Sequence, residues 1–236
     1  GRVHQYVDYP VAQVVQMMSL ASMPDDPLAK CVLFCFAPRK PFYKKFLYEP
    51  LPVESHLEAA LADHLNAEVV TRTVETKQDA VDYLTWTLFY RRLTQNPNYY
   101  HLHGVTPRHL SDYLSELVEN TLADLEQSRC VAVQDDLLVS PLNLGMVACY
   151  YSIRYTTIEL FANALSETTA LKGLIDILAM ATEFEQIPLR QGEARALRQL
   201  ARSLRPELTR PNYNSIETKI GVLLRAQLHR VPLPPD

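Results

Sequence analysis

Apolar residues recur every three or four positions over most of the chain beyond residue 55. The clearest case is 106–127, where Thr106 is a candidate N-cap, Pro107 occupies the first helical position, and leucines keep near-ideal helical spacing. Two capping patterns, the second weaker, predict earlier helix starts: Ser55 with Glu58, and Thr76 with Asp79. The pattern therefore predicts three helices between residues 55 and 127.

A change from helical to alternating periodicity follows the third helix. The runs 131–133 and 137–139 are short and apolar, and Asp135 and Asp136 lie between them. Such runs around a pair of turn-forming residues are typical of a β-hairpin. Three helices followed by a hairpin is the order of a winged-helix domain.

Beyond Pro141 the pattern is helical again. Five apolar faces are predicted, at 144–151, 157–165, 171–184, 192–204 and 216–228. Thr169 and Ser215 are candidate N-caps. Three prolines fall between these helices, where they cost no helical hydrogen bond: Pro188, Pro206 and Pro211. This part of the chain is therefore predicted to be a helical bundle.

The first 50 residues follow a different pattern. A short strand is predicted at Val3–Val7 and a helix after Tyr9-Pro10, while the apolar run Cys31–Phe36 is typical of a strand buried on both faces of a parallel sheet. These elements are too few to close an α/β core, so the chain is expected to be cut from a longer protein. Prolines around a short basic and aromatic helix, Phe42–Leu47, predict a domain boundary near residue 50. The expected fold class is mainly α with a small α/β part.

The composition argues against several classes of function. The 236 residues have a formal net charge of −4 and only six glycines, and they contain no Walker-type phosphate loop. An acidic balance argues against a free-standing nucleic-acid binder, because phosphate contact depends on clustered Lys and Arg. The cysteines lack metal-ligand spacing and are expected to be buried thiols in a reducing compartment: Cys31, Cys35, Cys130 and Cys149. No signal peptide or membrane-spanning stretch is recognisable, which predicts an intracellular protein without a membrane role.

Two polar clusters have a plain structural explanation. His101, His103 and His109 lack a carboxylate or thiolate at ligand spacing, which favours a solvated loop over a metal site. Asp135 and Asp136 fit a turn better than an acid–base pair, because adjacent strand residues point to opposite faces. We therefore predict no metal ligand and no catalytic residue in the chain.

The best basic and aromatic cluster comprises Arg91, Arg92, Tyr90, Tyr99 and Tyr100. Such a mixture can hold phosphates and stack bases. However, the next helix is acidic and makes no basic groove, since it carries Glu116, Glu119, Asp124 and Glu126. This favours an intramolecular junction between the winged helix and the RecA-like part. A second, short basic patch is interpreted as a solvated helix face: Arg39, Lys40, Lys44 and Lys45.

The segment 16–24 resembles the last ATPase motif of superfamily-two helicases. In Ski-two-like helicases two arginines of this motif face the nucleotide phosphates, and Leu20 and Met23 stand in their places here. Leucine and methionine offer neither the charge nor the forked donors of a guanidinium, so the motif is expected to be degenerate. Gln16, the one polar residue of the motif still present, is a candidate vestigial nucleotide contact.

Four further blocks of specific sequence lie at 46–57, 77–87, 91–100 and 141–145. They closely resemble the carboxy-terminal cassette of the large two-cassette spliceosomal RNA helicases of the bad-response-to-refrigeration type, a Ski-two-like family with Sec63 domains. The resemblance covers essentially the whole chain. It implies that residues 1–50 end the second RecA-like helicase domain, 51–141 form the winged helix, and 142–236 begin a Sec63-like helical domain.

The resemblance also implies a role. Such a cassette regulates its active amino-terminal neighbour and serves as a protein-interaction platform in pre-mRNA splicing, without turnover of its own. Implied partners are other domains of the same helicase and spliceosomal proteins of the tri-snRNP in the nucleus, with at most weak RNA contact. ATP is possible in the full cassette, although this chain alone is expected to hold no cofactor.

Two alternatives stay open. The chain could be a segment of an active ATP-dependent Ski-two-like RNA or DNA helicase, such as the activating signal cointegrator complex helicase, whose corresponding blocks look similar. Alternatively, the winged helix could read nucleic acid directly, in which case RNA binding with a steep salt dependence is expected.

Overall fold

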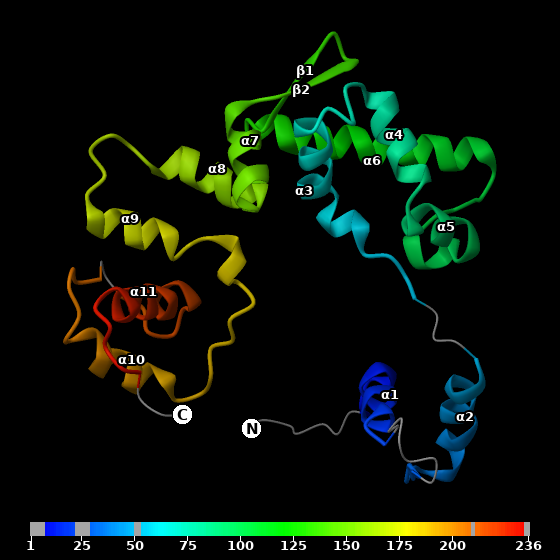
Figure 1. The fold of residues 1–236 in the computed structure, drawn as a ribbon, viewed down its shortest axis with the longest axis horizontal. Coiled ribbons are helices and arrows are strands. Elements are labelled where there is room, and N and C mark those ends of the chain that lie inside the picture. Colours follow the sequence, from blue (N-terminus) through cyan, green and yellow to red (C-terminus); the bar gives the residue numbers. More distant parts are fainter. Residues whose placement is uncertain (1–7, 22–28, 50–52, 209–210, 234–236) are drawn as a thin grey trace. The chain divides into compact units, whose positions relative to one another are not determined.

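The computed structural model describes residues 8–21, 29–49, 53–208 and 211–233, and it divides into two compact units, 1–54 and 55–236 (Figure 1). The described part is mainly helical, with one two-stranded sheet. The mainly α fold class predicted from the sequence is confirmed.

The first unit contains α1 (Val11–Ser19), a single 3₁₀ turn (Ala37–Arg39) and α2 (Lys40–Tyr48). The helix after Pro10 and the short basic helix are confirmed, whereas the buried strand predicted at 31–36 is wrong. That run is extended and exposed, with Phe34 at 92% of its full accessibility. A strand needs neighbouring strands to bond its backbone, and the described part of this unit contains none. The strand predicted at 3–7 lies outside the described residues.

The prediction that the cysteines are buried is only partly correct, again because residues 31–36 are exposed. Cys31 and Cys35 lie on the extended run and are exposed, which contradicts the expected burial. Cys130 is buried, and burial raises the pKa of its thiol, while Cys149 is half-buried. All four thiols are free.

The second unit opens with the predicted winged-helix order. Its elements are α3 (Leu57–Val70), α4 (Lys77–Thr85), α5 (Leu88–Gln95), the 3₁₀ turn Pro97–Tyr100, α6 (Pro107–Gln127), β1 (Val131–Gln134) and β2 (Leu138–Pro141). The short helix α5 was not predicted as a separate element. Helices α3, α4 and α6 pack around one core of leucines and valines, which includes Leu61, Leu84, Leu114 and Leu122.

Local sequence signals account for most of these boundaries. Thr76 and Asp79 form a complete capping box, in which Thr76 Oγ1 accepts from Asp79 N at 3.1 Å and Asp79 Oδ2 accepts from Thr76 N at 2.9 Å. Thr106 caps α6 by accepting from the backbone N of His109. The capping box predicted at Ser55 and Glu58 is wrong, because α3 begins one residue later, after His56.

The turn of the hairpin lies where the sequence predicted it. Asp135 and Asp136 have φ angles of 51° and 52°, and β1 pairs antiparallel with β2 so that Gln134 faces Leu138. Two successive left-handed residues are the geometry of a type I′ turn, which Asp and Asn tolerate better than most residues. Thr76 adds an antiparallel bridge to Leu138 and ties the hairpin to the start of α4.

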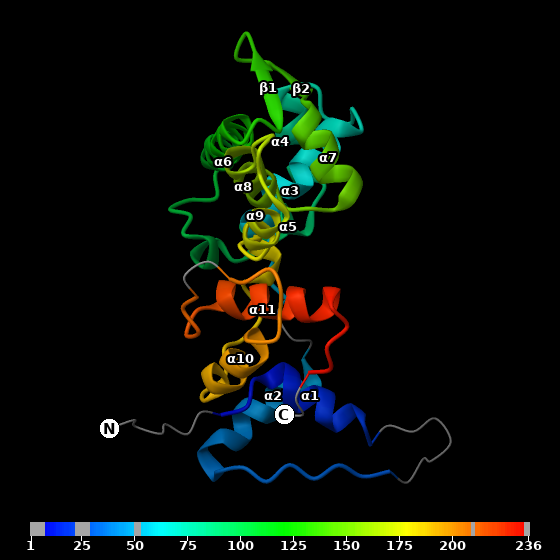
Figure 2. The ribbon, with the colours of Figure 1, turned by 90° about the vertical axis from the view of Figure 1, so that its left-hand side faces the viewer.

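Helices fill the rest of the second unit: α7 (Asn143–Tyr151), α8 (Tyr155–Ala164), α9 (Leu171–Leu178), the 3₁₀ turn Thr182–Phe184, α10 (Glu193–Ala201) and α11 (Ile216–Leu228). The single helix predicted at 171–184 is wrong beyond 178, because the backbone N of Thr182 donates to the hydroxyl of Thr157 instead of continuing the helix. Helices α10 and α11 lie side by side (Figure 2) and enclose a second, smaller core that includes Leu197, Leu204 and Val222.

The two N-cap predictions in this region had opposite outcomes. Ser215 caps α11, since its hydroxyl accepts from the backbone N of Thr218. Thr169 does not cap α9, which begins after Ala170, and its hydroxyl accepts from the backbone N of Ser166. Pro188, Pro206 and Pro211 all fall between helices, as predicted.

Candidate interaction surfaces

The segment predicted to be a degenerate helicase motif, 16–24, begins on α1, and its described part ends just after that helix. Gln16 is exposed, and its backbone carbonyl oxygen accepts from the Ser19 hydroxyl at 2.7 Å. Leu20 follows the last helical residue and is 76% exposed, while Met23 lies outside the described residues. No lysine or arginine lies on α1. A nucleotide contact of Gln16 therefore stays a prediction, as does the loss of a motif arginine at the exposed Leu20.

The basic and aromatic cluster near α5 is dispersed by the fold. Tyr100 is buried, its ring packs edge-on against Phe89 with centroids 5.3 Å apart, and its hydroxyl accepts from the backbone N of Ser55 at 2.8 Å. Arg92 donates to Gln95 on the same helix, and Arg91 is exposed. Tyr100 therefore belongs to the core, whereas Tyr99 is 45% exposed. The predicted junction with the RecA-like part stays a prediction.

Helix α6 would be the recognition helix if this winged helix read nucleic acid in the helix-turn-helix manner. Its exposed surface is acidic, with Asp112, Glu116, Glu119, Asp124 and Glu126. Two cationic side chains approach this acidic surface. Nε of Arg108 lies 3.9 Å from a carboxylate oxygen of Asp112, and Nζ of Lys77 lies 3.9 Å from one of Glu119. An acidic surface of this kind repels phosphates, so α6 is not suited to nucleic-acid readout.

The three clustered histidines lie around the start of α6. The ring of His109 is 3.0 Å from the Thr106 hydroxyl and packs against Gly104, where an added Cβ would lie 2.4 Å from the ring. Within the described residues no group of three or more His, Cys, Asp or Glu side chains is arranged to hold a metal ion. Across the same residues, no helix combines the length and apolar character needed to cross a bilayer.

The winged helix and the following helices share a polar junction at the start of α8. Asp63 on α3 accepts from the backbone N of Tyr155 at 2.8 Å, and Glu183 accepts from the backbone N of Arg154 at 2.9 Å and from the hydroxyl of Thr157 at 2.6 Å. Two carboxylates from distant segments thus satisfy the free amides of one helix N-terminus, where negative charge is favoured. Burial alone would raise the pKa of Glu183, but these hydrogen bonds outweigh it and lower that pKa.

A second contact at this junction depends on the absence of a side chain. The side-chain amide of Asn66 donates to the carbonyl of Gly145 at 3.0 Å, and a Cβ at Gly145 would lie 2.1 Å from the carbonyl oxygen of Cys130. Helix α7 therefore packs so closely on α3 and the start of β1 that only glycine fits at position 145.

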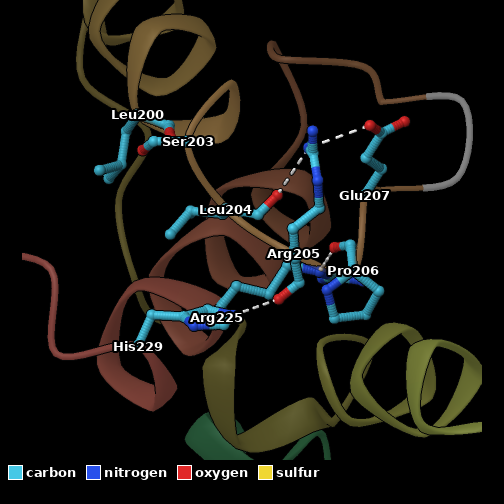
Figure 3. Close-up of polar contacts among 8 residues, drawn as sticks. All are labelled: Leu200, Ser203, Leu204, Arg205, Pro206, Glu207, Arg225 and His229. Atoms are coloured by element: carbon cyan, nitrogen blue, oxygen red, sulfur yellow. Dashed lines mark hydrogen bonds and ion pairs between the residues drawn. The ribbon is translucent and has the colours of Figure 1, made fainter.

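A buried arginine on α11 contacts α9 and the loop between α10 and α11. Arg225 on α11 is fully buried and donates to the carbonyl of Pro206 at 2.8 Å (Figure 3). It also pairs with Asp176 on α9. Nearby, His229 contacts the carbonyl oxygen of Arg205, whose guanidinium pairs with Glu207 at 3.0 Å. Sequence reasoning missed this cluster, because Asp176 and Arg225 are 49 residues apart and neither belongs to a recognisable motif.

Helix α7 presents the most apolar exposed surface of the junction. It has no charged residue, and one side is solvent-exposed: Met146, Val147, Tyr150 and Tyr151. Together with Val70 and Cys149 these side chains line a hollow of about 440 Å³. An exposed apolar surface next to a rigid junction is the usual character of a protein-binding site.

Comparisons with known proteins match the two parts of the second unit. A winged helix-turn-helix domain family matches residues 54–135, and the Sec63 Brl domain family matches residues 141–236. The chain is 56% identical over 234 residues to the human U5 small nuclear ribonucleoprotein 200 kDa helicase, covering 99% of this chain and 11% of that protein.

Two other relatives are similar over the same span. The DExH-box ATP-dependent RNA helicase DExH13 of Arabidopsis thaliana is 55% identical over 231 residues, covering 98% of this chain and 11% of that protein. The activating signal cointegrator 1 complex subunit 3-like protein of Dictyostelium discoideum is 50% identical over 243 residues, covering the whole chain and 11% of that protein. With its winged helix and Sec63 Brl domain in this order and this identity along its length, the chain belongs to the family of the U5 small nuclear ribonucleoprotein 200 kDa helicases.

Proposed function

We propose that the chain is part of the degenerate carboxy-terminal cassette of a spliceosomal RNA helicase, where it regulates the active cassette and binds other proteins during pre-mRNA splicing. The observation that carries this proposal is the replacement of two motif arginines by Leu20 and Met23. Leu20 is exposed at the end of α1, a helix without any cation.

The chemical consequence follows from what an arginine does in nucleotide hydrolysis. Removal of such an arginine costs about three to five orders of magnitude in turnover. A cassette with Leu20 and Met23 in this motif is therefore expected to hydrolyse ATP very slowly even if the full cassette binds it. We assign no catalytic residue to this chain, and Gln16 is the residue that we propose for contact with a nucleotide.

The proposed partners are other domains of the same helicase and spliceosomal proteins of the tri-snRNP, in the nucleus. The names of the U5 small nuclear ribonucleoprotein relatives support this setting. The acidic exposed face of α6 supports protein contact over RNA contact, because clustered carboxylates repel a phosphate backbone. A rigid cassette can bias its neighbour by packing against one of that neighbour's conformations, without turnover of its own.

The alternative function is that of a segment of an active helicase. The 50% identity to an activating signal cointegrator 1 complex subunit 3-like protein favours it. The two proposals differ in whether the cassette that contains α1 turns over ATP, which is directly measurable.

The test uses the full parent helicase with the phosphate-binding lysine of its other cassette replaced. We expect no ATP turnover above background from the cassette that contains this chain. The double change Leu20→Arg with Met23→Arg then measures how far these two positions limit hydrolysis, and Val15→Arg on the same helix is the matched control for an added cation. Brisk RNA-stimulated turnover by the unmodified cassette would overturn the proposal in favour of the active helicase.

A further inference from the structure

Helix α10 carries a row of arginines on its solvent side. Arg195 and Arg198 lie on the helix, and Arg202 follows its last residue with helical φ and ψ angles of −63° and −29°. Residues three and four positions apart are neighbours on a helix surface, so the three side chains form one row. All three are exposed, whereas Leu197 and Ala201 on the core side of the helix are buried. We call these three residues the α10 arginine row.

No carboxylate neutralises this row within the described part of the chain. The one acidic residue of α10, Glu193, accepts instead from Nζ of Lys219 at 2.8 Å and from the backbone N of Arg190 at 2.9 Å. No other Asp or Glu in the described ranges lies within ion-pair distance of an arginine of the row. The guanidinium carbon of Arg198 lies 5.4 Å from the centre of the Tyr213 ring, a cation–π contact that orders the side chain and leaves its charge unneutralised.

The row opposes the stability of its own helix. Like charges three or four residues apart on a helix repel each other, and the row contains two such pairs in succession. Residues 193–228, from the start of α10 to the end of α11, contain seven lysines and arginines and three glutamates, although the whole chain has a net charge of −4. A local conflict of this kind is typical of a functional surface. The unneutralised charge therefore indicates an anionic partner.

RNA phosphates and protein carboxylates are the two anions that a row of arginines would bind in a macromolecule. Sites for single-stranded RNA combine a cationic groove with aromatic rings on which bases stack. Here Tyr213 is half-buried beside Arg198, and neither hollow next to α10 is lined by an arginine of the row. An acidic helix, in contrast, presents carboxylates at the same spacing as the row, because both follow the helical repeat. The geometry therefore favours an acidic helix over RNA.

We propose that the α10 arginine row binds an acidic helix of a partner protein, one that presents three carboxylates over two turns of a single face. Each guanidinium would pair with one carboxylate through its forked N–H donors. This inference rests on the proposed role as a protein-interaction platform and names one surface and the chemistry of its partner. Its test measures peptide binding and the test of the proposed function measures ATP turnover, so the two fail separately.

The test uses the 236-residue chain and three synthetic alanine-rich helical peptides with a fluorescent label. The first has glutamates at positions i, i+4 and i+7, the second has glutamines there, and the third has its three glutamates on three different sides of the helix. We expect the first peptide to bind about tenfold more tightly than the second at low salt, because each exposed ion pair contributes up to about fivefold. The third peptide is expected to bind about threefold more weakly than the first. Fluorescence anisotropy measures these affinities, and added salt is expected to reduce the differences.

Two variants separate the row from the net charge of the chain. The row variant is expected to lose the preference for the first peptide, and it combines Arg195→Gln, Arg198→Gln and Arg202→Gln. The matched control changes the net charge equally on another exposed basic helix, α2, and is expected to keep the preference: Lys40→Gln, Lys44→Gln and Lys45→Gln. Circular dichroism verifies that both variants are folded.

Several outcomes would overturn the proposal. Equal binding of the first and third peptides, or equal losses in the two variants, would show general attraction between charges and no defined site. Tighter binding of a single-stranded oligouridylate that the row variant abolishes would assign the row to RNA. Association of the chain with itself that the row variant abolishes would assign the row to a second copy. Loss of the preference in the parent helicase would show that its own polypeptide covers α10, whereas the same preference there would support the proposal.

Discussion

The guanidinium of Arg225 donates to a carboxylate oxygen of Asp176 at 2.5 Å, and Arg225 is completely buried while the Asp176 side chain is 31% exposed. The same guanidinium also satisfies the carbonyl oxygens of Pro206 and Gly221. One side chain thus holds α9, α11 and the loop between α10 and α11 together. Removal of one partner from such a buried network leaves several polar groups without a hydrogen bond, which is more costly than the net value of the pair.

We therefore expect Arg225→Ala to lower the free energy of unfolding by about 3–5 kcal/mol. Chemical denaturation followed by circular dichroism measures this change. Arg202→Ala, at an exposed position just after α10, is the control and is expected to change stability by less than about 0.5 kcal/mol. A cost at Arg225 no larger than at Arg202 would show that the network does not hold these helices together.

Gly145→Ala tests the close approach of α7 to α3 and β1. The added methyl group would lie 2.1 Å from the carbonyl oxygen of Cys130 and 2.6 Å from Oδ1 of Asn66, so the backbone must shift. We expect a loss of about 1–3 kcal/mol of stability, measured by the same denaturation. Gly173→Ala, also within a helix, is the control, because its methyl group would meet only Thr169 within 4 Å and alanine favours a helix more than glycine. Equal effects at the two glycines would contradict the packing described here.

Glu183→Gln tests the charge at the start of α8. Because the folded protein lowers the pKa of Glu183 below its ordinary value of 4.5, the charged carboxylate stabilises the fold above that pH, and this stabilisation is lost as the pH falls through the folded pKa. The substitution is expected to cost about 0.5–1 kcal/mol at pH values near neutrality and progressively less in acid. Urea denaturation across this pH range is the measurement.

Glu185→Gln is the matched control for that experiment, since Glu185 is exposed two residues away and makes no side-chain hydrogen bond to α8 within the described residues. Its effect is expected to be small at every pH. A pH-independent loss at Glu183 would mean that its shape, and not its charge, supports α8.

The hairpin turn offers a stabilising substitution. Asp135 and Asp136 both have positive φ angles, and a type I′ turn with φ near 50° at both positions is best satisfied by Asn followed by Gly. We expect Asp135→Asn with Asp136→Gly to raise the free energy of unfolding by about 0.5–1 kcal/mol and the melting temperature by a few degrees. Unchanged or lower stability would indicate that one of the aspartates makes a contact that outweighs the improved turn geometry.

Parts of the candidate surfaces could be predicted from the sequence. The acidic face of α6 followed from helical spacing, whereas the degenerate motif at Gln16 and Leu20 stays a prediction. The exposed apolar side of α7 was not predictable, because its residues appear in the sequence as an ordinary helix core. Only the packing of α7 through Gly145 decides which side of that helix faces solvent.

The sequence by itself determined the helices and the hairpin, because these depend on interactions within a few residues: the apolar spacing of α6, the caps at Thr106 and Ser215, and the aspartate pair of the turn. Tertiary structure alone decided that residues 31–36 are exposed, that α9 ends at Leu178, and that Asp63 and Glu183 cap one helix. The physical reason is range. Each of these outcomes depends on whether a distant segment supplies a hydrogen-bond partner or an apolar neighbour, and local periodicity contains no information about that.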